Sequence, residues 1–191
     1  MDRINAARKQ TVPESGNSAG IPRGAVRYEA VFLDNDEVDT MLRSIRGDAP
    51  YPRHSSNFHI TMVFSPEQDA GALYGKEAEA RFIGYKACEV TDEKGNTSCN
   101  EGLKVLLSYD DTALAEYLGV VDKNFHLTGS YTTASKYTEY IDFSDMKPID
   151  YTLRGVFGAF LEGTGVVLDA TDAGRPPEGK SGSSCDANPN L

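Results

Sequence analysis

Two short stretches of the chain repeat one pattern of residues that can carry out acid–base chemistry. Phe58-His59-Ile60-Thr61 and Phe125-His126-Leu127-Thr128 both read Phe-His-aliphatic-Thr, and their histidines lie 67 positions apart (126 − 59). The chain has 3 histidines, and the repeat uses two of them. Imidazole exchanges protons near neutral pH, so two histidines can supply both the acid and the base of one reaction. The repeat therefore predicts a single site that is built twice from the same unit.

The first motif lies in a predicted β-strand, residues 58–64, with one polar and one apolar face. Side chains alternate between the two faces of a strand. The predicted polar face carries His59, Thr61 and Val63. The other face carries only large apolar side chains, which are Phe58, Ile60, Met62 and Phe64. We therefore expect this apolar face to lie in the core and His59 and Thr61 to point into a cleft or into solvent.

The second motif, within a predicted strand at residues 124–132, divides in the same way. Its predicted polar face carries His126, Thr128 and Ser130, opposite a core face with Phe125, Leu127, Gly129 and Tyr131. Tyr131 has a second interpretation, in which the strand ends by Ser130 and the tyrosine ring stacks on a nucleobase over the cleft. If the two motif strands are neighbours in one sheet, both histidines and both threonines converge on one spot.

A phosphate group fits such a spot. Threonine hydroxyls donate hydrogen bonds to non-bridging phosphate oxygens, and an imidazolium adds a charge-assisted hydrogen bond. A neutral histidine can take a proton from the attacking oxygen, while a protonated histidine gives one to the leaving oxygen. This chemistry requires no metal, and no CxxC pair or His-Glu pairing of the sequence has zinc-ligand spacing. We therefore expect neither a metal nor a cofactor.

The paired motif resembles those of the two-histidine phosphoesterase superfamily, which carries a His-x-Thr motif on each of two strands. The resemblance rests on His59-Ile60-Thr61-Met62 and His126-Leu127-Thr128-Gly129, and it covers about residues 26–162. The last position of the motif is usually hydrophobic in that superfamily, so Gly129 departs from the pattern. The segment HITMVFSP, at residues 59–66, also looks like predicted RNA-repair domains of the same superfamily.

The resemblance implies a fold and an activity. The fold would be α+β with two lobes, whose antiparallel sheets form a concave groove beside a few flanking helices. The activity would be a metal-independent phosphodiesterase, in which His59 and His126 divide the acid and base roles and Thr61 and Thr128 hold the phosphate. The expected substrate is a small nucleotide or an RNA terminus: a 2′,3′-cyclic phosphate, a 2′–5′ linkage or a cyclic oligonucleotide.

Two other functions remain open for the same residues. A non-catalytic module could bind a nucleotide in the groove and sequester it without turnover. A structural or interaction protein could carry the repeat by coincidence, since threonine is an ordinary strand residue and a single histidine on a strand is more often a surface residue. Turnover of a nucleotide distinguishes a phosphodiesterase from both alternatives.

Four further residues are candidates for substrate binding. Ser130 and Tyr131 directly follow the second motif, and Lys136 could hold a second phosphate from the loop after it. His54 precedes the first motif in a loop and could line the mouth of the groove. For His54 and Lys136, a solvated loop residue without a role in binding is the competing interpretation.

The hydrophobic pattern predicts the elements that must position the motifs. Apolar residues at helical spacing and acidic residues at the start predict helices at 36–46 and 111–118. Alternating or apolar runs predict six strands, at residues 25–33, 58–64, 81–91, 102–109, 124–132 and 153–162. The order strand, helix, three strands, helix, two strands indicates an α+β fold with a curved sheet.

Composition and charge narrow the domain organisation and the partners. The length of 191 residues suits one domain. We expect this domain at 25–168, between a flexible arm at 1–24 and a disordered tail at 169–191, because both ends are rich in Ser, Gly and Pro. The net charge of −10 disfavours duplex DNA, whose phosphates bind clustered Lys and Arg.

The sequence also carries signals about location. It has no apolar run long enough to predict a membrane span. The polar start and the odd number of cysteines, 3, predict reduced thiols in a cytoplasmic protein. The oligomeric state has no signal in the sequence.

Overall fold

The computed structural model describes residues 26–67, 70–119, 125–133 and 137–169, and its architecture is α+β. The two α-helices of this part are α1 (Asn35–Arg46) and α2 (Thr112–Leu118). Its strands are β1 (Val26–Leu33), β2 (Arg53–His54), β3 (His59–Phe64), β4 (Glu77–Thr91), β5 (Thr97–Ser108), β6 (His126–Tyr131), β7 (Lys147–Leu161) and β8 (Gly165–Val167). Two short 3₁₀-helices, η1 (Gly71–Leu73) and η2 (Thr138–Tyr140), complete the described elements.

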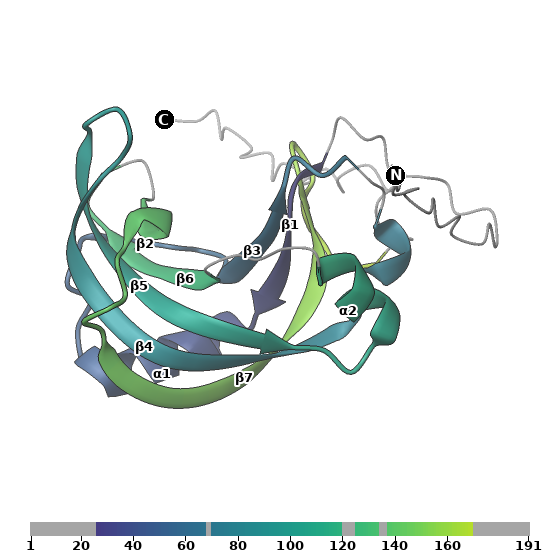
Figure 1. Cartoon of the computed structure of the whole chain (residues 1–191), viewed down its shortest axis with the longest axis horizontal. Coiled ribbons are helices and arrows are strands. Elements are labelled where there is room, and N and C mark those ends of the chain that lie inside the picture. The colour runs from purple at the N-terminus through teal and green to yellow at the C-terminus, as the bar shows by residue number, and fades with distance from the viewer. Residues whose placement is uncertain (1–25, 68–69, 120–124, 134–136, 170–191) are drawn as a thin grey trace, which may run out of the picture.

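All the described strands belong to one antiparallel sheet in the order β2-β6-β5-β4-β7-β1-β3, with β8 added beside β7. The sheet curls into a half-barrel, as Figure 1 shows. Because of this curl, β3 and β6, which do not pair with each other, come within 8 Å between Cα atoms. The curl therefore places the two motif strands side by side, as the sequence required for a common site.

The chain contains an internal repeat that the strand order reveals. The first repeat, residues 26–91, contains β1, α1, β3 and β4 in this order, and the second repeat, residues 97–161, contains β5, α2, β6 and β7. The short elements β2 and η1 are additional in the first repeat, and η2 is additional in the second. In each repeat the motif strand pairs with the first strand, β3 with β1 and β6 with β5. The long strands cross over, so that β7 of the second repeat pairs with β1 and β4 of the first repeat pairs with β5.

The two motif ladders have the same register. His59 faces Phe32 and Thr61 faces Ala30, whereas His126 faces Lys104 and Thr128 faces Gly102. The partners on the first strands are offset by 72 positions in both pairs (104 − 32 and 102 − 30), which makes the repeat regular.

Each ladder also contains a β-bulge directly after the motif threonine. In the first ladder the next pair is Glu29 with Val63, and in the second it is Asn100 with Tyr131. A bulge inserts one extra residue into one strand and shifts the alternation of faces beyond it. Residues after the bulge therefore lie on the opposite face from the one that simple alternation predicts.

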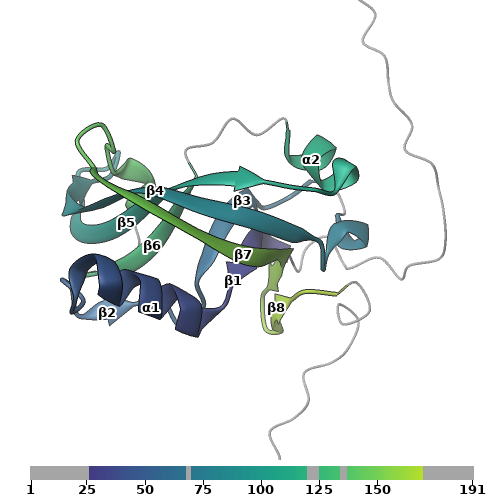
Figure 2. The ribbon, with the colours of Figure 1, turned by 90° about the horizontal axis from the view of Figure 1, so that it is seen from below.

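The main hydrophobic core lies on the face of the sheet that the helices cover. The helix α1 contributes its four buried residues Val38, Met41, Leu42 and Ile45, whose spacing follows the helical period. From the motif strands, Ile60, Met62 and Leu127 enter this core with 0% exposure. The predicted core positions of Ile60, Met62 and Leu127 are confirmed. Phe125, also predicted on the core face, is only partly buried against the core and lines the cavity beside His126, so that prediction was wrong in part. Figure 2 shows α1 alongside the sheet.

A second, smaller cluster lies on the opposite face, beyond the second motif. Val90 packs there against Ile141 and Phe143, from the segment 137–146 that includes η2. Gly102 makes this packing possible, because a Cβ at this position would lie 2.7 Å from both Ile141 Cδ1 and Thr138 Cγ2. The segment 137–146 therefore covers part of the motif face in the second repeat.

The predicted helices and six strands are present, with differences in extent. β4 begins at Glu77 instead of 81, and β7 begins at Lys147 instead of 153, because the first residues of β7 are exposed and give no apolar alternation. The short elements β2, β8, η1 and η2 were not predicted. The predicted arm at 1–24 lies outside the described residues, as does the predicted tail apart from Asp169. Within the described part, no helix has the length and apolar character of a bilayer span.

Candidate active site

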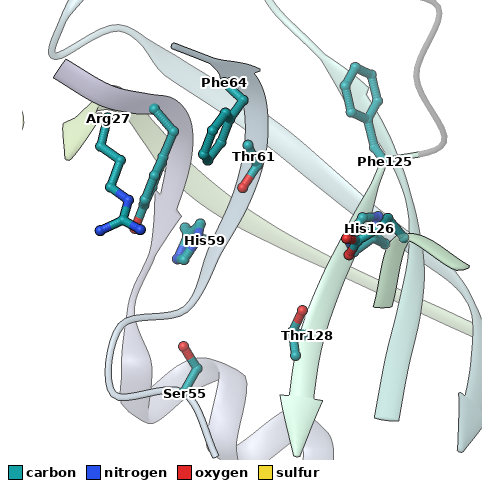
Figure 3. Close-up of a pocket in the computed structure, with 10 residues that line it drawn as sticks. Arg27, Ser55, His59, Thr61, Phe64, Phe125, His126 and Thr128 are labelled. Carbon is teal, nitrogen blue, oxygen red and sulfur yellow. The ribbon is translucent and has the colours of Figure 1, made fainter. Parts of the chain in front are cut away.

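A cavity of about 810 Å³ lies between β3 and β6, and the four predicted catalytic residues all line it. His59 and Thr61 enter from β3, and His126 and Thr128 enter from β6 (Figure 3). All four side chains are partly exposed, as groups that meet a ligand must be. The cavity is on the face of the sheet opposite the main core, as the alternation of side chains requires.

Neighbouring groups fix the ring of His59. Its Nδ1 lies 2.9 Å from the carbonyl oxygen of Asn57. A carbonyl oxygen only accepts, so Nδ1 carries the proton and, in the neutral ring, Nε2 carries the lone pair. The ring also stacks on Tyr28, with centroids 4.8 Å apart and planes at 18°, and Tyr28 stacks in turn on Phe160 at 5.2 Å. Both the tautomer and the plane of His59 are therefore set by neighbours.

The second motif is held differently. Thr128 donates its hydroxyl to Thr138 Oγ1 at 2.9 Å, and Thr138 is fully buried in η2. This hydrogen bond fixes the rotamer of Thr128 at the wall of the cavity. The hydroxyls can exchange roles by rotation, so that Thr138 donates and Thr128 turns its proton to a ligand.

The bulge after Thr61 overturns two predicted positions. Phe64 was predicted in the core and Val63 on the polar face. Instead Val63 packs against the core, while Phe64 lines the cavity and is 63% exposed. The physical reason is the extra residue in β3, which reverses the alternation after the motif. A large exposed aromatic ring consequently stands beside Thr61, as Figure 3 shows.

The bulge after Thr128 has the same effect on Ser130 and Tyr131. Ser130 was predicted on the polar face, but it is fully buried, does not line the cavity, and donates its backbone N–H to Glu101. Tyr131 was favoured for the core face, but it pairs with Asn100 and so shares the face of Thr128. Its half-buried side chain is not among those that line the cavity.

Of the other two candidates, His54 lies away from the site and Lys136 is not among the described residues. His54 is exposed on β2, where it pairs with Ser130, and it does not line the cavity. The predicted set therefore divides into four residues that converge and three, His54, Ser130 and Tyr131, that lie elsewhere on the sheet.

Sequence reasoning missed most of the remaining wall. Arg27 and Tyr28 come from β1, Ser55 from the segment before β3, and Glu139 from η2. The carbonyl oxygen of Arg27 accepts the backbone N–H of Ser65 at 3.0 Å. Burial raises the pKa of the neighbouring Tyr28 hydroxyl, and the charge of Arg27 opposes this rise. Arg27 and Tyr28 could have been found from their position on β1, the strand that pairs with the first motif strand. This signal is recognisable only once the strand pairing is known.

The lining combines groups suited to a phosphate with groups suited to a flat apolar ring. The imidazoles, the threonine hydroxyls and the guanidinium of Arg27 are donors to phosphate oxygens. Phe64 and Phe125 present aromatic surfaces to the same space. In the described parts of the chain, no three His, Cys, Asp or Glu residues are grouped so that they could hold a metal ion.

No protein-family model matches the chain, and no curated protein or solved structure matches it.

Proposed function

We propose that the protein is a metal-independent phosphodiesterase of the two-histidine type. The observation that carries this proposal is the convergence of two His-x-Thr motifs, from strands that do not pair, on one cavity. Two histidines separated by 67 positions reach a common space only because the sheet curls. A coincidental repeat on unrelated surface strands has no reason to converge in this way.

The contacts of His59 support its role as the general base. Its neutral ring presents the lone pair on Nε2, because Nδ1 donates to Asn57. His59 then takes the proton of the attacking water or hydroxyl as the new P–O bond forms. His126, protonated, gives its proton to the oxygen that leaves as the old P–O bond breaks. The pair returns to its starting state when one proton passes from His59 to His126 through solvent.

The threonines stabilise the charge that builds up on the phosphate. Thr61 and Thr128 each donate to a non-bridging oxygen, from opposite walls of the cavity. For Thr128 this requires that its hydrogen bond with Thr138 reverse, so that Thr138 becomes the donor. The buried hydroxyl of Thr138 thus keeps Thr128 in place in both states.

The remaining lining favours a substrate with a base and a second phosphate. Phe64 and Phe125 offer stacking surfaces on either side of the motifs, and base stacking on aromatic rings stabilises single-stranded nucleotides. Arg27 lies on the first-repeat side of the cavity and is the one Lys or Arg that lines it in the described part of the chain. The proposed substrate class is therefore a short or cyclic oligonucleotide, in preference to a nucleoside 2′,3′-cyclic phosphate.

The same geometry supports a two-lobed form of the fold. One lobe would hold β3, β1 and β7, and the other β6, β5 and β4. The regular offset of the two ladders supports an origin of the lobes from one repeated unit. The cavity between β3 and β6 would then be the groove between the lobes.

A panel of nucleotides tests the proposed activity. The full chain is incubated in EDTA with 2′,3′-cyclic nucleotides, 2′–5′ dinucleotides and cyclic dinucleotides, and the products are separated by chromatography. We expect hydrolysis, with higher kcat/KM for the substrates that carry two phosphates. Tight binding with intact ligand would instead assign the cavity to a sequestering module. If the protein neither bound nor hydrolysed any of these nucleotides, the proposal would be overturned.

A further inference from the structure

Two glutamates are buried at matching positions of the two repeats. Glu29 on β1 and Glu101 on β5 are both 0% exposed, and they have the same offset of 72 positions (101 − 29) as the motif ladders. Each lies opposite the bulge that follows a motif threonine. Carboxylates are rarely buried in this way unless charged or hydrogen-bonding partners compensate for the loss of water.

Glu101 supports the bulge of β6 directly. Its Oε2 accepts the backbone N–H of Ser130 at 2.8 Å. A bulge interrupts the ladder, and a buried N–H without an acceptor is costly. Gly129 makes room for the carboxylate, because a Cβ there would lie 2.7 Å from the carboxyl carbon of Glu101. The glycine that departs from the usual motif is thus explained by the buried glutamate beside it.

The other oxygen of Glu101 ties the second repeat to the first. Arg46, at the end of α1, forms an ion pair with Glu101 Oε1, and its side chain is only 11% exposed. The helix of the first repeat therefore holds the glutamate that supports the motif strand of the second repeat.

Glu29 has the reciprocal arrangement. Tyr117, on α2 of the second repeat, donates its hydroxyl to Glu29 Oε2 at 2.8 Å, and Tyr74, which follows η1, donates to Oε1 at 3.1 Å. Arg46 and Tyr117 each stand in the last turn of their helix. The helix of each repeat thus contacts the buried glutamate of the other.

We propose that Glu29 and Glu101 are positioning residues that hold the two bulges and thereby fix His59–Thr61 and His126–Thr128 relative to each other. The proposal rests on the proposed phosphodiesterase function. Neither glutamate lines the cavity, so neither touches the substrate. The two motif strands do not pair with each other, so other contacts must fix their relative position. This position matters because displacements of about 1 Å in catalytic groups cost on the order of 100-fold in rate.

The double variant Arg46→Met/Glu101→Met separates positioning from stability. An apolar pair can replace a buried ion pair with little loss of stability, whereas removal of one partner leaves a buried charge. We therefore expect the double variant to unfold moderately below the wild-type temperature, because Ser130 N–H loses its acceptor. Glu101→Met alone should unfold well below the double variant, because it also leaves Arg46 as a buried charge without its partner. The double variant still lacks an acceptor for Ser130 N–H, so its kcat should fall by about 10- to 100-fold with KM within about threefold. Wild-type kcat in the double variant would overturn the proposal.

Hydrogen exchange gives a readout that does not depend on catalysis. The Ser130 amide should exchange at least about tenfold faster in the double variant than in the wild type, because its acceptor is gone. Glu101→Gln keeps an acceptor oxygen and should keep most of the protection and activity. Unchanged exchange at Ser130 in the double variant would overturn the positioning role even if the wild type proved inactive on every nucleotide tested.

A matched pair of tyrosine variants tests Glu29. Tyr117→Phe removes one donor to Glu29, whereas Tyr109→Phe removes a buried hydroxyl that has no hydrogen-bond partner in the structure. We expect Tyr117→Phe to lower kcat by about tenfold and to shift the NMR resonances of the His59 ring, and Tyr109→Phe to change neither. Equal effects of the two variants would contradict the role of Glu29.

Discussion

The two repeats share their frame and differ in the walls they give the cavity. Both provide a motif strand, a bulge after the threonine and a buried glutamate at the same offset. In the first repeat, Tyr28 stacks on His59, but its counterpart in the second ladder is the buried amide Asn100. The two repeats thus provide the same pair of motif side chains, and the different neighbours of His59 and His126 distinguish the two histidines.

The coverage of the motif face differs as well. Beside the first motif, Phe64 is exposed to the cavity. Beside the second motif, the segment 137–146 packs on the sheet and supplies the partner of Thr128. A symmetric pair of groups would accept a phosphodiester in either direction. In the proposed mechanism, the asymmetric walls would give the substrate one preferred direction, with the second phosphate near Arg27 on the side of the first repeat.

The largest expected effect comes from the histidines themselves. His59→Ala and His126→Ala should each lower kcat by about 10²–10⁴ while the fold stays intact, a typical loss for an acid–base group. The third histidine, His54, is exposed on β2 outside the cavity and provides the matched control. Steady-state kinetics with a dinucleotide and circular dichroism check both parts. Full activity in both motif variants would remove the proposed mechanism.

The threonines sharpen the comparison between the repeats. Thr61→Val and Thr128→Val should each lower kcat by about 10²–10³, because each removes a donor to the charge on the phosphate. Thr138→Val should cost about tenfold, since it removes the hydrogen-bond partner of Thr128 but no group that is proposed to contact the phosphate. Measurements of kcat for the three variants test whether Thr61→Val and Thr128→Val lose more activity than Thr138→Val. Equal losses for Thr128 and Thr138 would place both hydroxyls on the substrate.

The substrate-binding side of the first repeat should show smaller, selective effects. Phe64→Ala and Arg27→Gln should lower kcat/KM for a two-phosphate substrate by about tenfold, in line with the loss of one base stack or one phosphate contact. The loss for Arg27→Gln should be smaller with a nucleoside 2′,3′-cyclic phosphate. Arg43→Gln, an exposed arginine on α1, is the charge-matched control. Equal losses of Arg27→Gln on both substrates would place the guanidinium at the reacting phosphate.

The smallest effect concerns the N-cap of α2. Asp111 caps α2 through Leu114 N–H and also pairs with Lys76 at 2.8 Å, and these contacts hold the pKa of Asp111 below its usual range, with the Lys76 hydrogen bond the larger cause. A depressed pKa in the folded state stabilises the protein above the unfolded value of about 3.9.

This contribution is lost as the pH falls through the folded pKa. Asp111→Asn keeps the cap but not the charge, so its melting temperature should lie about 1–3 °C below the wild type near pH 6. The difference should vanish near pH 2. A difference that stayed constant over this range would assign the effect to the cap alone.

The sequence predicted the elements whose apolar residues recur with the period of a helix or a strand. The helix α1 has its apolar residues at helical spacing, and both motif strands alternate as strands do up to Thr61 and Thr128. The four motif residues that line the cavity were singled out for the same reason, because a repeated His-x-Thr pattern is recognisable without knowledge of strand pairing.

The rest depended on long-range contacts. The bulges that reposition Phe64, Ser130 and Tyr131 depend on which residues face them across the ladder, and these residues lie far away in the sequence. At the second bulge, for example, Glu101 on β5 accepts the N–H of Ser130 on β6. Glu139 reaches the cavity from a segment that begins only after the second motif strand. Alternation within one strand carries no information about these partners.

The central claim is that both motifs act on one phosphodiester, and a double-mutant cycle tests it most directly. The kcat of wild type, His59→Ala, His126→Ala and the double variant is measured with one cyclic dinucleotide in EDTA. Groups that act as a unit are strongly non-additive, so the double variant should be no more than about tenfold slower than either single variant. If the losses of the single variants multiplied in the double variant, the two histidines would act independently, and the account of a shared site would be contradicted.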